Sequence, residues 1–180
     1  MTATIEYVIV VDEEDKEIRF AEKLLAHQKG WLHRAFSAFI FRSHPETKKI
    51  ELLLQQRAAH KYHSPLLWTN TCCSHPRPGE DITAAGQRRL KEELGLSLTL
   101  NQIGYFHYHA HFSNGLSENE IDHILVGFVK PNVSIQANPS EIHDYKWAEL
   151  DAIQQSLASE PEQFTQWFAQ AFNLAVQHVC

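Results

Sequence analysis

A single helical segment between two β-rich stretches limits the folds that this chain can adopt. The composition becomes helical over residues 81–94, and Gly95 follows as a helix stop. One turn separates Arg89 from Glu92 and Glu93, so a guanidinium group and two carboxylates can share a helix face, although a solvated face has the same pattern. The residues expected on the buried side are Ile82, Ala85, Leu90 and Leu94.

Runs of aromatic and aliphatic residues predict strands on both sides of this helix. The expected strands cover residues 6–11, 34–42, 50–56, 96–100, 103–112 and 120–129. The second and third form a predicted hairpin, because the polar turn SHPETKK joins them. Residues 21–28 are expected to form a short helical or irregular segment closed by Gly30, and residues 62–79 a loop interrupted by prolines.

Two helices are predicted at the end of the chain, over about residues 148–157 and 161–179. Ser159 and Glu162 have the spacing of a capping box, and Pro161 between them favours a helix start. The order of elements indicates an α+β layered fold. With 180 residues, 43% of them hydrophobic, and no flexible linker, the chain is expected to form one globular domain over residues 1–180.

Charge and hydropathy argue against two classes of partner. A formal net charge of -6 disfavours general nucleic-acid binding. No apolar run reaches the roughly 18 residues of a membrane span, and the acidic N-terminus does not resemble a signal peptide, so we expect a cytoplasmic protein. A local basic set suits a small anionic ligand and consists of Arg57, Lys61, Arg77, Arg88, Arg89 and Lys91.

Two short segments contain residues that favour chemistry. TNTCCSHP places the thiol of Cys73 two residues before His75, where a small buried cysteine beside a loop histidine is the alternative interpretation. Because Cys72 and Cys73 are adjacent, a disulfide framework is unfavourable and reduced thiols are expected. In GLSENEIDH, Glu118 and Glu120 would project from the same face of a strand, as they also would on a solvated edge.

Residues 74–96 resemble a Nudix box, G-x5-E-x7-R-E-U-x-E-E-x-G-U. The matching residues are Glu80, Arg88, Glu92, Glu93, Gly95 and Leu96. Ser74 stands at the first glycine position, and Arg89 replaces the glutamate that follows the arginine. Nudix hydrolases use the box glutamates to gather metal ions that activate water against a diphosphate. The change to Arg89 argues against hydrolysis, because its positive charge can hold a diphosphate instead.

Six motifs in order resemble the type I isopentenyl-diphosphate Δ-isomerases, which are Nudix-fold enzymes: AHQKGWLHRAFS, R-x3-K at Arg57 and Lys61, WTNTCCSHP, RRLKEELG, YFHYHA and SENE. The resemblance extends from Tyr7 to about Phe172. It implies an α/β/α layered fold with a mixed sheet, a Nudix helix and C-terminal helices. It also implies an isomerase of isoprenoid biosynthesis, which interconverts isopentenyl and dimethylallyl diphosphates through a tertiary carbocation.

The resemblance assigns the proton transfers to Cys73 and Glu120, on opposite sides of the substrate, with Tyr108 near the glutamate. Which of the two protonates the substrate in each direction stays open. Because Tyr108 would point inward, its alternating neighbours are expected on the outer face of the strand, with a separate metal site as the alternative. These neighbours are His107, His109 and His111.

The resemblance also assigns the substrate-binding residues. Arg57, Lys61 and Arg89 are expected around the diphosphate. Trp167 is expected over the carbocation, where its π face would contribute about 1 to 2 kcal/mol. Core-like spacing with neighbouring apolar residues makes ordinary packing of Trp167 the alternative.

Two metal sites are implied by the same resemblance. The first would hold Mn²⁺, Mg²⁺ or Zn²⁺. Its ligands would be His27, His33, His75, Glu118 and Glu120. The second would hold Mg²⁺ between the substrate diphosphate, Glu93 and the backbone carbonyl of Cys73. The expected partner is a small-molecule diphosphate, and the expected assembly is a monomer or a weak dimer.

Two other functions stay open from the sequence. A Nudix pyrophosphohydrolase agrees with the box but leaves Arg89 and Cys73 unexplained. A non-enzymatic module that binds a metal or a diphosphate is the third hypothesis.

Overall fold

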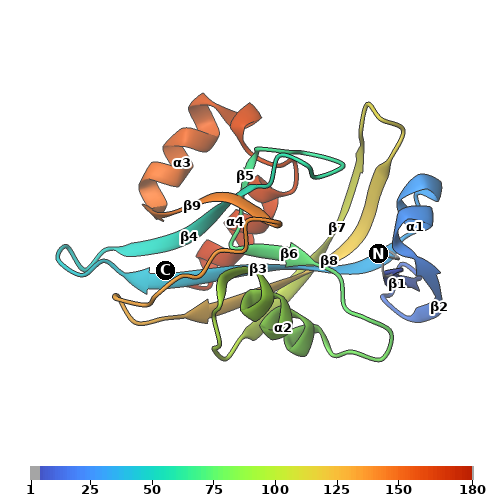
Figure 1. Cartoon of the computed structure of the whole chain (residues 1–180), viewed down its shortest axis with the longest axis horizontal. Coiled ribbons are helices and arrows are strands. Elements are labelled where there is room, and N and C mark those ends of the chain that lie inside the picture. Colours follow the sequence, from blue (N-terminus) through green and yellow to red (C-terminus); the bar gives the residue numbers. More distant parts are fainter. Residues whose placement is uncertain (1–4, 180) are drawn as a thin grey trace.

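The computed structural model describes residues 5–179, and a nine-stranded mixed sheet lies at its centre (Figure 1). The strands are β1 (Tyr7–Val11), β2 (Glu17–Glu22), β3 (His33–Ser43), β4 (Ile50–Arg57), β5 (Trp68–Thr69), β6 (Cys72–Ser74), β7 (Asn101–His111), β8 (Ser117–Phe128) and β9 (Ile142–Glu149). The helices are α1 (Lys23–Lys29), α2 (Ile82–Leu94), α3 (Leu150–Ser159), the 3-10 turn η1 (Pro161–Gln163) and α4 (Phe168–Gln177). Within the described part of the chain, no helix combines the length and apolar character needed to cross a membrane.

Strand β3 organises the sheet because it pairs with four other strands. β8 runs parallel to β3, and their pairing begins with His33 opposite Glu120. Since a strand has two edges, the antiparallel strands β1, β6 and β4 must share the other one, at successive positions. Cys73 of β6 pairs there with Ser37. This register brings His33, Glu120 and Cys73 to the same part of the sheet.

Helices cover both faces of the sheet, with α2 on one side and α3 and α4 on the other (Figure 1). Alternate residues of β3 point to opposite faces. Phe36 and Ile40 therefore pack in the cluster beneath α2, whereas Phe39 and Phe41 pack in the cluster that includes α4. Burial on both faces explains why β3 reads as a nearly continuous apolar run. The predicted α/β/α layered fold with a mixed sheet is confirmed.

Helix α2 has strong local signals at both ends, and the prediction for residues 81–94 is confirmed. The Asp81 carboxylate accepts hydrogen bonds from the backbone N–H groups of Thr83 (2.9 Å) and Ala84 (3.2 Å). Gly95 ends the helix in the left-handed conformation, with φ of 68°, which glycine adopts without a steric penalty. The four residues predicted on the inner face, Ile82, Ala85, Leu90 and Leu94, are all buried.

Replacing Asp81 with alanine is expected to lower the free energy of unfolding by about 0.5 to 2 kcal/mol, because two backbone donors lose their acceptor. Urea denaturation followed by circular dichroism measures this loss. Glu22→Ala is the matched control, since Glu22 stands at the N-terminus of α1 without a side-chain capping bond. An equal loss in both variants would contradict a capping role for Asp81.

The single helix predicted over residues 161–179 is wrong. The chain forms η1, leaves helical geometry at Phe164 and then enters α4. Phe164 forms a bridge with Trp68, and the N–H of Thr165 donates to the Trp68 carbonyl at 3.0 Å. These contacts outweigh the local helix preference. The predicted capping box also does not form, because Glu160 rather than Ser159 precedes η1 and makes no side-chain capping bond.

Several strand predictions need correction as well. The hairpin of β3 and β4 is confirmed, but residues 96–100 form no strand, because Leu96 and Leu100 pack irregularly into the cluster beneath α2. The predicted loop over residues 62–79 contains β5 and β6. β2 and β9 were not predicted. Most of their side chains are exposed or half-buried, and the two strands form through pairing with β1 and β4.

Candidate active site

One face of β8 carries three buried carboxyl groups. Glu118, Glu120 and Asp122 follow one another at two-residue spacing, and all three line one cavity. Tyr108 of β7 pairs with Glu120 across the strands and is also buried. The hydroxyl of Tyr108 has no hydrogen-bond partner within the described structure. The acidic face of β8 and the inner face of β7, which carries Tyr108, therefore lie on the same side of the sheet.

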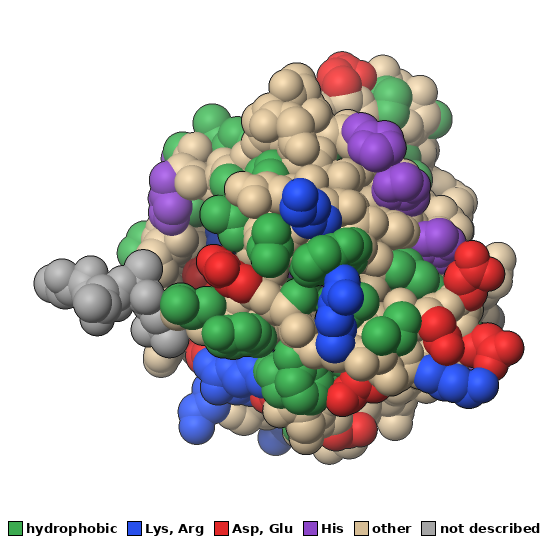
Figure 2. Space-filling view, turned by 90° about the vertical axis from the view of Figure 1, so that its right-hand side faces the viewer, with side chains coloured by type: hydrophobic (Ala, Val, Ile, Leu, Met, Phe, Trp, Pro, Cys, Tyr) green, Lys and Arg blue, Asp and Glu red, His purple; other side chains and the backbone are tan. Residues whose placement is uncertain are grey.

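The outer face of β7 carries the three alternating histidines, His107, His109 and His111, which are exposed as predicted. Figure 2 shows histidine side chains in a row on the surface. Nε2 of His107 lies 2.6 Å from the side-chain oxygen of Asn119. These three histidines are thus separated from the cavity by the sheet itself.

Four side chains from four separate parts of the chain converge beside the cavity. They are His27 of α1, His33 of β3, His75 after β6 and Glu120 of β8. One ligand atom from each lies within 4.8 Å of the others. Nε2 of His33 and Nε2 of His75 approach Oε1 of Glu120 at 3.3 and 3.0 Å. Glu118 does not join this group and instead contacts Nε2 of His63 at 3.0 Å.

Backbone contacts orient two of these imidazole rings. Nδ1 of His27 lies 2.7 Å from the carbonyl oxygen of Lys23, and Nδ1 of His33 lies 2.8 Å from that of Trp31. A carbonyl can only accept, so each Nδ1 carries the proton. Nε2 of neutral His27 then presents a lone pair inward, whereas Nε2 of His33 faces Oε1 of Glu120. Among residues 5–179, Nε2 of His27 is buried without a hydrogen-bond partner. Such second contacts are typical of metal-binding histidines, and these four residues form a group that can hold a divalent metal ion.

Burial and neighbouring charges shift the pKa values of this group. Burial lowers the pKa of His27 to about 3 and that of His75 to about 4, and the surrounding histidines act in the same direction. For Glu120, burial opposes ionisation, but hydrogen bonds from His33 and His75 outweigh it and hold the pKa well below its usual range. His33 differs, because its hydrogen bond with Glu120 and the charge of that carboxylate outweigh burial and raise its pKa. Metal binding requires a neutral imidazole, so an ion bound here would displace the His33 proton.

Cys72 and Cys73 point to opposite sides of β6. Cys72 is fully buried in the cluster beneath α2, whereas Cys73 lines the cavity. NH1 of Arg57 lies 3.8 Å from Sγ of Cys73. Burial nevertheless raises the pKa of the Cys73 thiol to about 12, with Arg57 acting in the opposite direction. The thiol therefore keeps its proton at neutral pH.

Alkylation of Cys73 by iodoacetamide is expected to be slow at pH 8 in the metal-free protein. Only the thiolate reacts, and with a pKa of about 12 its fraction should rise about tenfold with each pH unit from pH 8 to 11. Peptide mass spectrometry on the Cys72→Ala variant measures the rate, with free cysteine as the reference. A rate that levels off near pH 9 would contradict the raised pKa.

Trp167 lies at the boundary between the cavity and the core. Its indole N–H donates to the side-chain oxygen of Asn70 at 3.1 Å, and its ring meets the Tyr108 ring edge-on at 6.1 Å. Trp167 lines the cavity and also packs in the cluster of α4. A position facing the substrate and ordinary core packing, the two interpretations from the sequence, are therefore compatible. Trp167 precedes α4 and is not part of the helix itself.

Basic side chains occupy one end of the cavity. Arg57, Lys61 and Arg89 line it together, although they come from β4, the following loop and α2. Nε of Arg57 and Nε of Arg89 are buried donors without partners among the described residues. NH2 of Arg89 binds Oε1 of buried Glu93 at 2.5 Å. This end therefore offers unused hydrogen-bond donors to an anion.

The cavity unites most of the predicted site residues. Those on its lining are Arg57, Lys61, Cys73, His75, Arg89, Glu118, Glu120 and Trp167. His27 and His33 contact the site from behind His75 and Glu120, and Glu93 contacts Arg89 in the same way.

A sequence model described as NUDIX domain matches residues 31–168 of this chain.

Curated relatives match nearly the whole chain. An isopentenyl-diphosphate Delta-isomerase from Aliivibrio fischeri strain MJ11 is 44% identical over 178 residues, which cover 97% of each chain. Another from Serratia proteamaculans strain 568 is 47% identical over 165 residues, covering 91% of this chain and 87% of the relative. The chain belongs to the isopentenyl-diphosphate Δ-isomerases of the NUDIX family.

Solved structures show the same fold at much lower identity. DR0079 from Deinococcus radiodurans superposes with a TM-score of 0.63 at 19% identity, covering 86% of this chain and 90% of that one. A MutT protein from Methanosarcina mazei Go1 has a TM-score of 0.62 at 17% identity, with coverages of 82% and 95%. The isomerase family thus shares its layered architecture with proteins of distant sequence.

The structure adds residues to this isomerase site that sequence reasoning missed. Asp122 continues the two-residue alternation of Glu118 and Glu120, so its position in the strand was the available signal. His63 binds Glu118 from a loop, and no local pattern marks it. Asn70 links Trp167 to β6 through its bond to the Cys72 carbonyl (2.8 Å), and only the fold reveals this role.

Proposed function

We infer that this enzyme interconverts isopentenyl and dimethylallyl diphosphates, and we propose that Cys73 and Glu120 exchange the protons. The observation that carries the proposal is one cavity that combines a protonated thiol, a carboxylate bound by imidazoles and a cluster of basic side chains. The names of the relatives support the same activity. We further propose that it acts in the cytoplasm as a monomer or a weak dimer.

The reaction needs one proton donor and one acceptor around the five-carbon chain. Protonation of the terminal alkene carbon produces a tertiary carbocation, and loss of a proton from C2 gives the allylic isomer. Cys73 holds a proton at neutral pH, whereas Glu120 is ionised. Within the described part of the chain, the buried Tyr108 hydroxyl has no hydrogen-bond partner, and we propose that it forms a hydrogen bond near Glu120.

A carbocation also needs protection from water, which would capture it as an alcohol. Trp167 closes the cavity with its ring, and its contact with Asn70 holds the ring in place. We propose that the π face of Trp167 stabilises the cation by about 1 to 2 kcal/mol.

The basic end of the cavity is the proposed diphosphate site. Arg57 and Arg89 each have a buried Nε donor without a partner among the residues that the structure describes, and Lys61 adds a third positive charge. Guanidinium groups suit phosphate oxygens because they donate two parallel hydrogen bonds. Mg²⁺ bound with the diphosphate is proposed to use Glu93 and the backbone carbonyl of Cys73, in keeping with its preference for oxygen ligands.

The residues of the His/Glu group fit a divalent ion, because inward-facing Nε2 atoms and a carboxylate are suitable ligands. We propose His27, His33, His75, Glu118 and Glu120 as its ligands, with Mn²⁺, Mg²⁺ or Zn²⁺ as candidates. Oε2 of Glu118 is buried without a partner in the described structure and is available for this role. When bound, the ion would supply positive charge that lowers the proton affinity of Glu120.

Incubation of the purified protein with isopentenyl diphosphate and Mg²⁺ tests the function. Proton NMR is expected to show dimethylallyl diphosphate accumulating to equilibrium with no release of phosphate. Release of phosphate or pyrophosphate without an allylic product would instead establish a hydrolase. Binding without any turnover would indicate a non-enzymatic module.

A further inference from the structure

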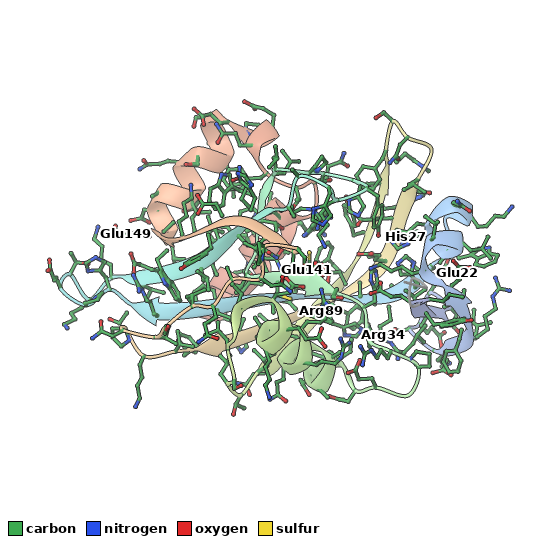
Figure 3. The ribbon with its side chains drawn as sticks, viewed as in Figure 1. Glu22, His27, Arg34, Arg89, Glu141 and Glu149 are labelled. Atoms are coloured by element: carbon green, nitrogen blue, oxygen red, sulfur yellow. The ribbon has the colours of Figure 1, made fainter. Side chains whose placement is uncertain are left out.

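Glu141 links two of the basic residues of the cavity. It lies just before β9, and its carboxylate contacts Nζ of Lys61 through one oxygen and NH2 of Arg89 through the other, the latter at 3.2 Å. Figure 3 labels Arg89 and Glu141, which lie near each other between α2 and the segment that leads into β9. One carboxylate thus bridges a loop lysine and a helix arginine.

Backbone hydrogen bonds fix the position of this carboxylate. The N–H of Ala58, at the end of β4, donates to the Glu141 carbonyl at 3.1 Å. The N–H of Asn138 donates to the carbonyl of Glu93 in α2 at 2.8 Å, and the N–H of Glu141 donates to the carbonyl of Asn138 at 3.0 Å. The segment that carries Glu141 is therefore tied to α2, which carries Arg89, and to Ala58, whose carbonyl accepts from the N–H of Lys61 at 3.2 Å.

Lys61 depends on this contact more than Arg89 does. Arg89 also binds Glu92 at 2.8 Å and Glu93 at 2.5 Å. Within the described part of the chain, Glu141 is the sole carboxylate that pairs with Lys61. A lysine side chain has many rotamers, and holding it in one of them before the ligand arrives removes an entropic cost from binding.

We propose that Glu141 is a positioning residue, which holds Lys61 against Arg89 at the spacing that a diphosphate needs. This inference rests on the proposed function, because the diphosphate site is itself a proposal. The ion pair with Lys61 is a quarter exposed on both sides, with side-chain exposures of 24% and 23%. Lys61 lines the cavity while it is held by this pair, so its ammonium group stays within reach of a ligand.

Glu141→Gln is expected to raise KM for isopentenyl diphosphate about tenfold and to change kcat less than about threefold, because only uniform binding is lost. The Kd of isopentyl diphosphate, a saturated and unreactive analogue, should rise by the same factor in calorimetry with Mg²⁺ present. Glu149→Gln is the matched control, since it breaks another Glu–Lys pair (2.7 Å, to Lys49) away from the cavity. The control should leave both constants unchanged.

A double-mutant cycle tests whether Glu141 acts through Lys61. In the Lys61→Gln background, Glu141→Gln should weaken analogue binding by less than about threefold, because the side chain that it positions is already gone. A full tenfold effect in that background would overturn the proposal. If Glu141→Gln alone bound the analogue as tightly as the wild type, the proposal would also be overturned. Tighter binding would overturn it too, because it would show that the Glu141 carboxylate competes with the diphosphate.

The outcomes separate this inference from the proposed function. Wild-type protein that neither binds isopentyl diphosphate nor forms the allylic product would contradict the function itself. Wild-type protein that does both, while Glu141→Gln does so equally well, would contradict only the role of Glu141. We expect Glu141→Gln and Glu149→Gln to unfold at similar midpoint temperatures. A much lower midpoint for Glu141→Gln alone would assign this residue a role in folding instead.

Discussion

The Cys73→Ala variant is expected to lose isomerase activity, with kcat reduced by at least about 10²- to 10⁴-fold, the range that one proton-transfer group typically contributes. The thiol lines the cavity and keeps its proton at neutral pH, because burial raises its pKa to about 12. Alanine removes the proton while leaving the basic end of the cavity intact. Binding of isopentyl diphosphate should therefore persist within about threefold, as calorimetry would show.

Cys72→Ala provides the matched control, because the neighbouring thiol is fully buried on the other side of β6. This variant should lose some stability through a small cavity but keep its activity within about tenfold. Product formation is followed by proton NMR in both variants. Ordinary turnover by Cys73→Ala would remove the central residue of the proposed mechanism.

Glu120→Gln is expected to reduce kcat by at least about 10³-fold, since the substitution affects two functions at once. The glutamine cannot accept or return a proton, and it removes a charged oxygen from the group formed with His27, His33 and His75. Its nearest partners, at 3.0 and 3.3 Å, are Nε2 of His75 and of His33. Equilibrium dialysis should therefore show weaker Mn²⁺ and Zn²⁺ binding at this group, by at least about 10-fold, because losing a ligand costs no less than losing a residue that orients one.

The control for this variant is Glu149→Gln, which makes the same chemical change at the far end of β9. Both variants carry one negative charge less, so an effect of net charge alone would appear in each. Full activity of Glu120→Gln with unchanged metal binding would contradict both assignments. Lost activity with unchanged metal binding would leave Glu120 as a proton-transfer residue and remove it from the ligand set.

Local patterns predicted those elements whose signals are themselves local. Helix α2 has a capping aspartate, an apolar side and a terminal glycine, all within a few turns of one another. β3 could be recognised because burial on both faces requires an almost unbroken apolar run. β9 and the break before α4 could not, since β9 depends on its pairing with β4 and the break depends on the contact of Phe164 and Thr165 with Trp68.

The site shows the same division. The alternation of Glu118 and Glu120 and the position of Cys73 before His75 are properties of the sequence, and resemblance to a family then assigned their roles. No local rule relates His27 to Glu120, because four separate parts of the chain bring the metal-binding group together. His63, Asn70 and Glu141 stayed unnoticed for the same reason.

The layered fold class, the family and the available chemical groups could be inferred from the order of residues along the chain, because periodicity, capping residues and motifs are local features. The tertiary structure decided which of these groups meet. Pairing of β3 with both β6 and β8 places the Cys73 thiol and the Glu120 carboxylate on one cavity. Packing of α2 against the segment before β9 turns Arg89 toward Glu141, and such long-range contacts depend on the whole chain being folded.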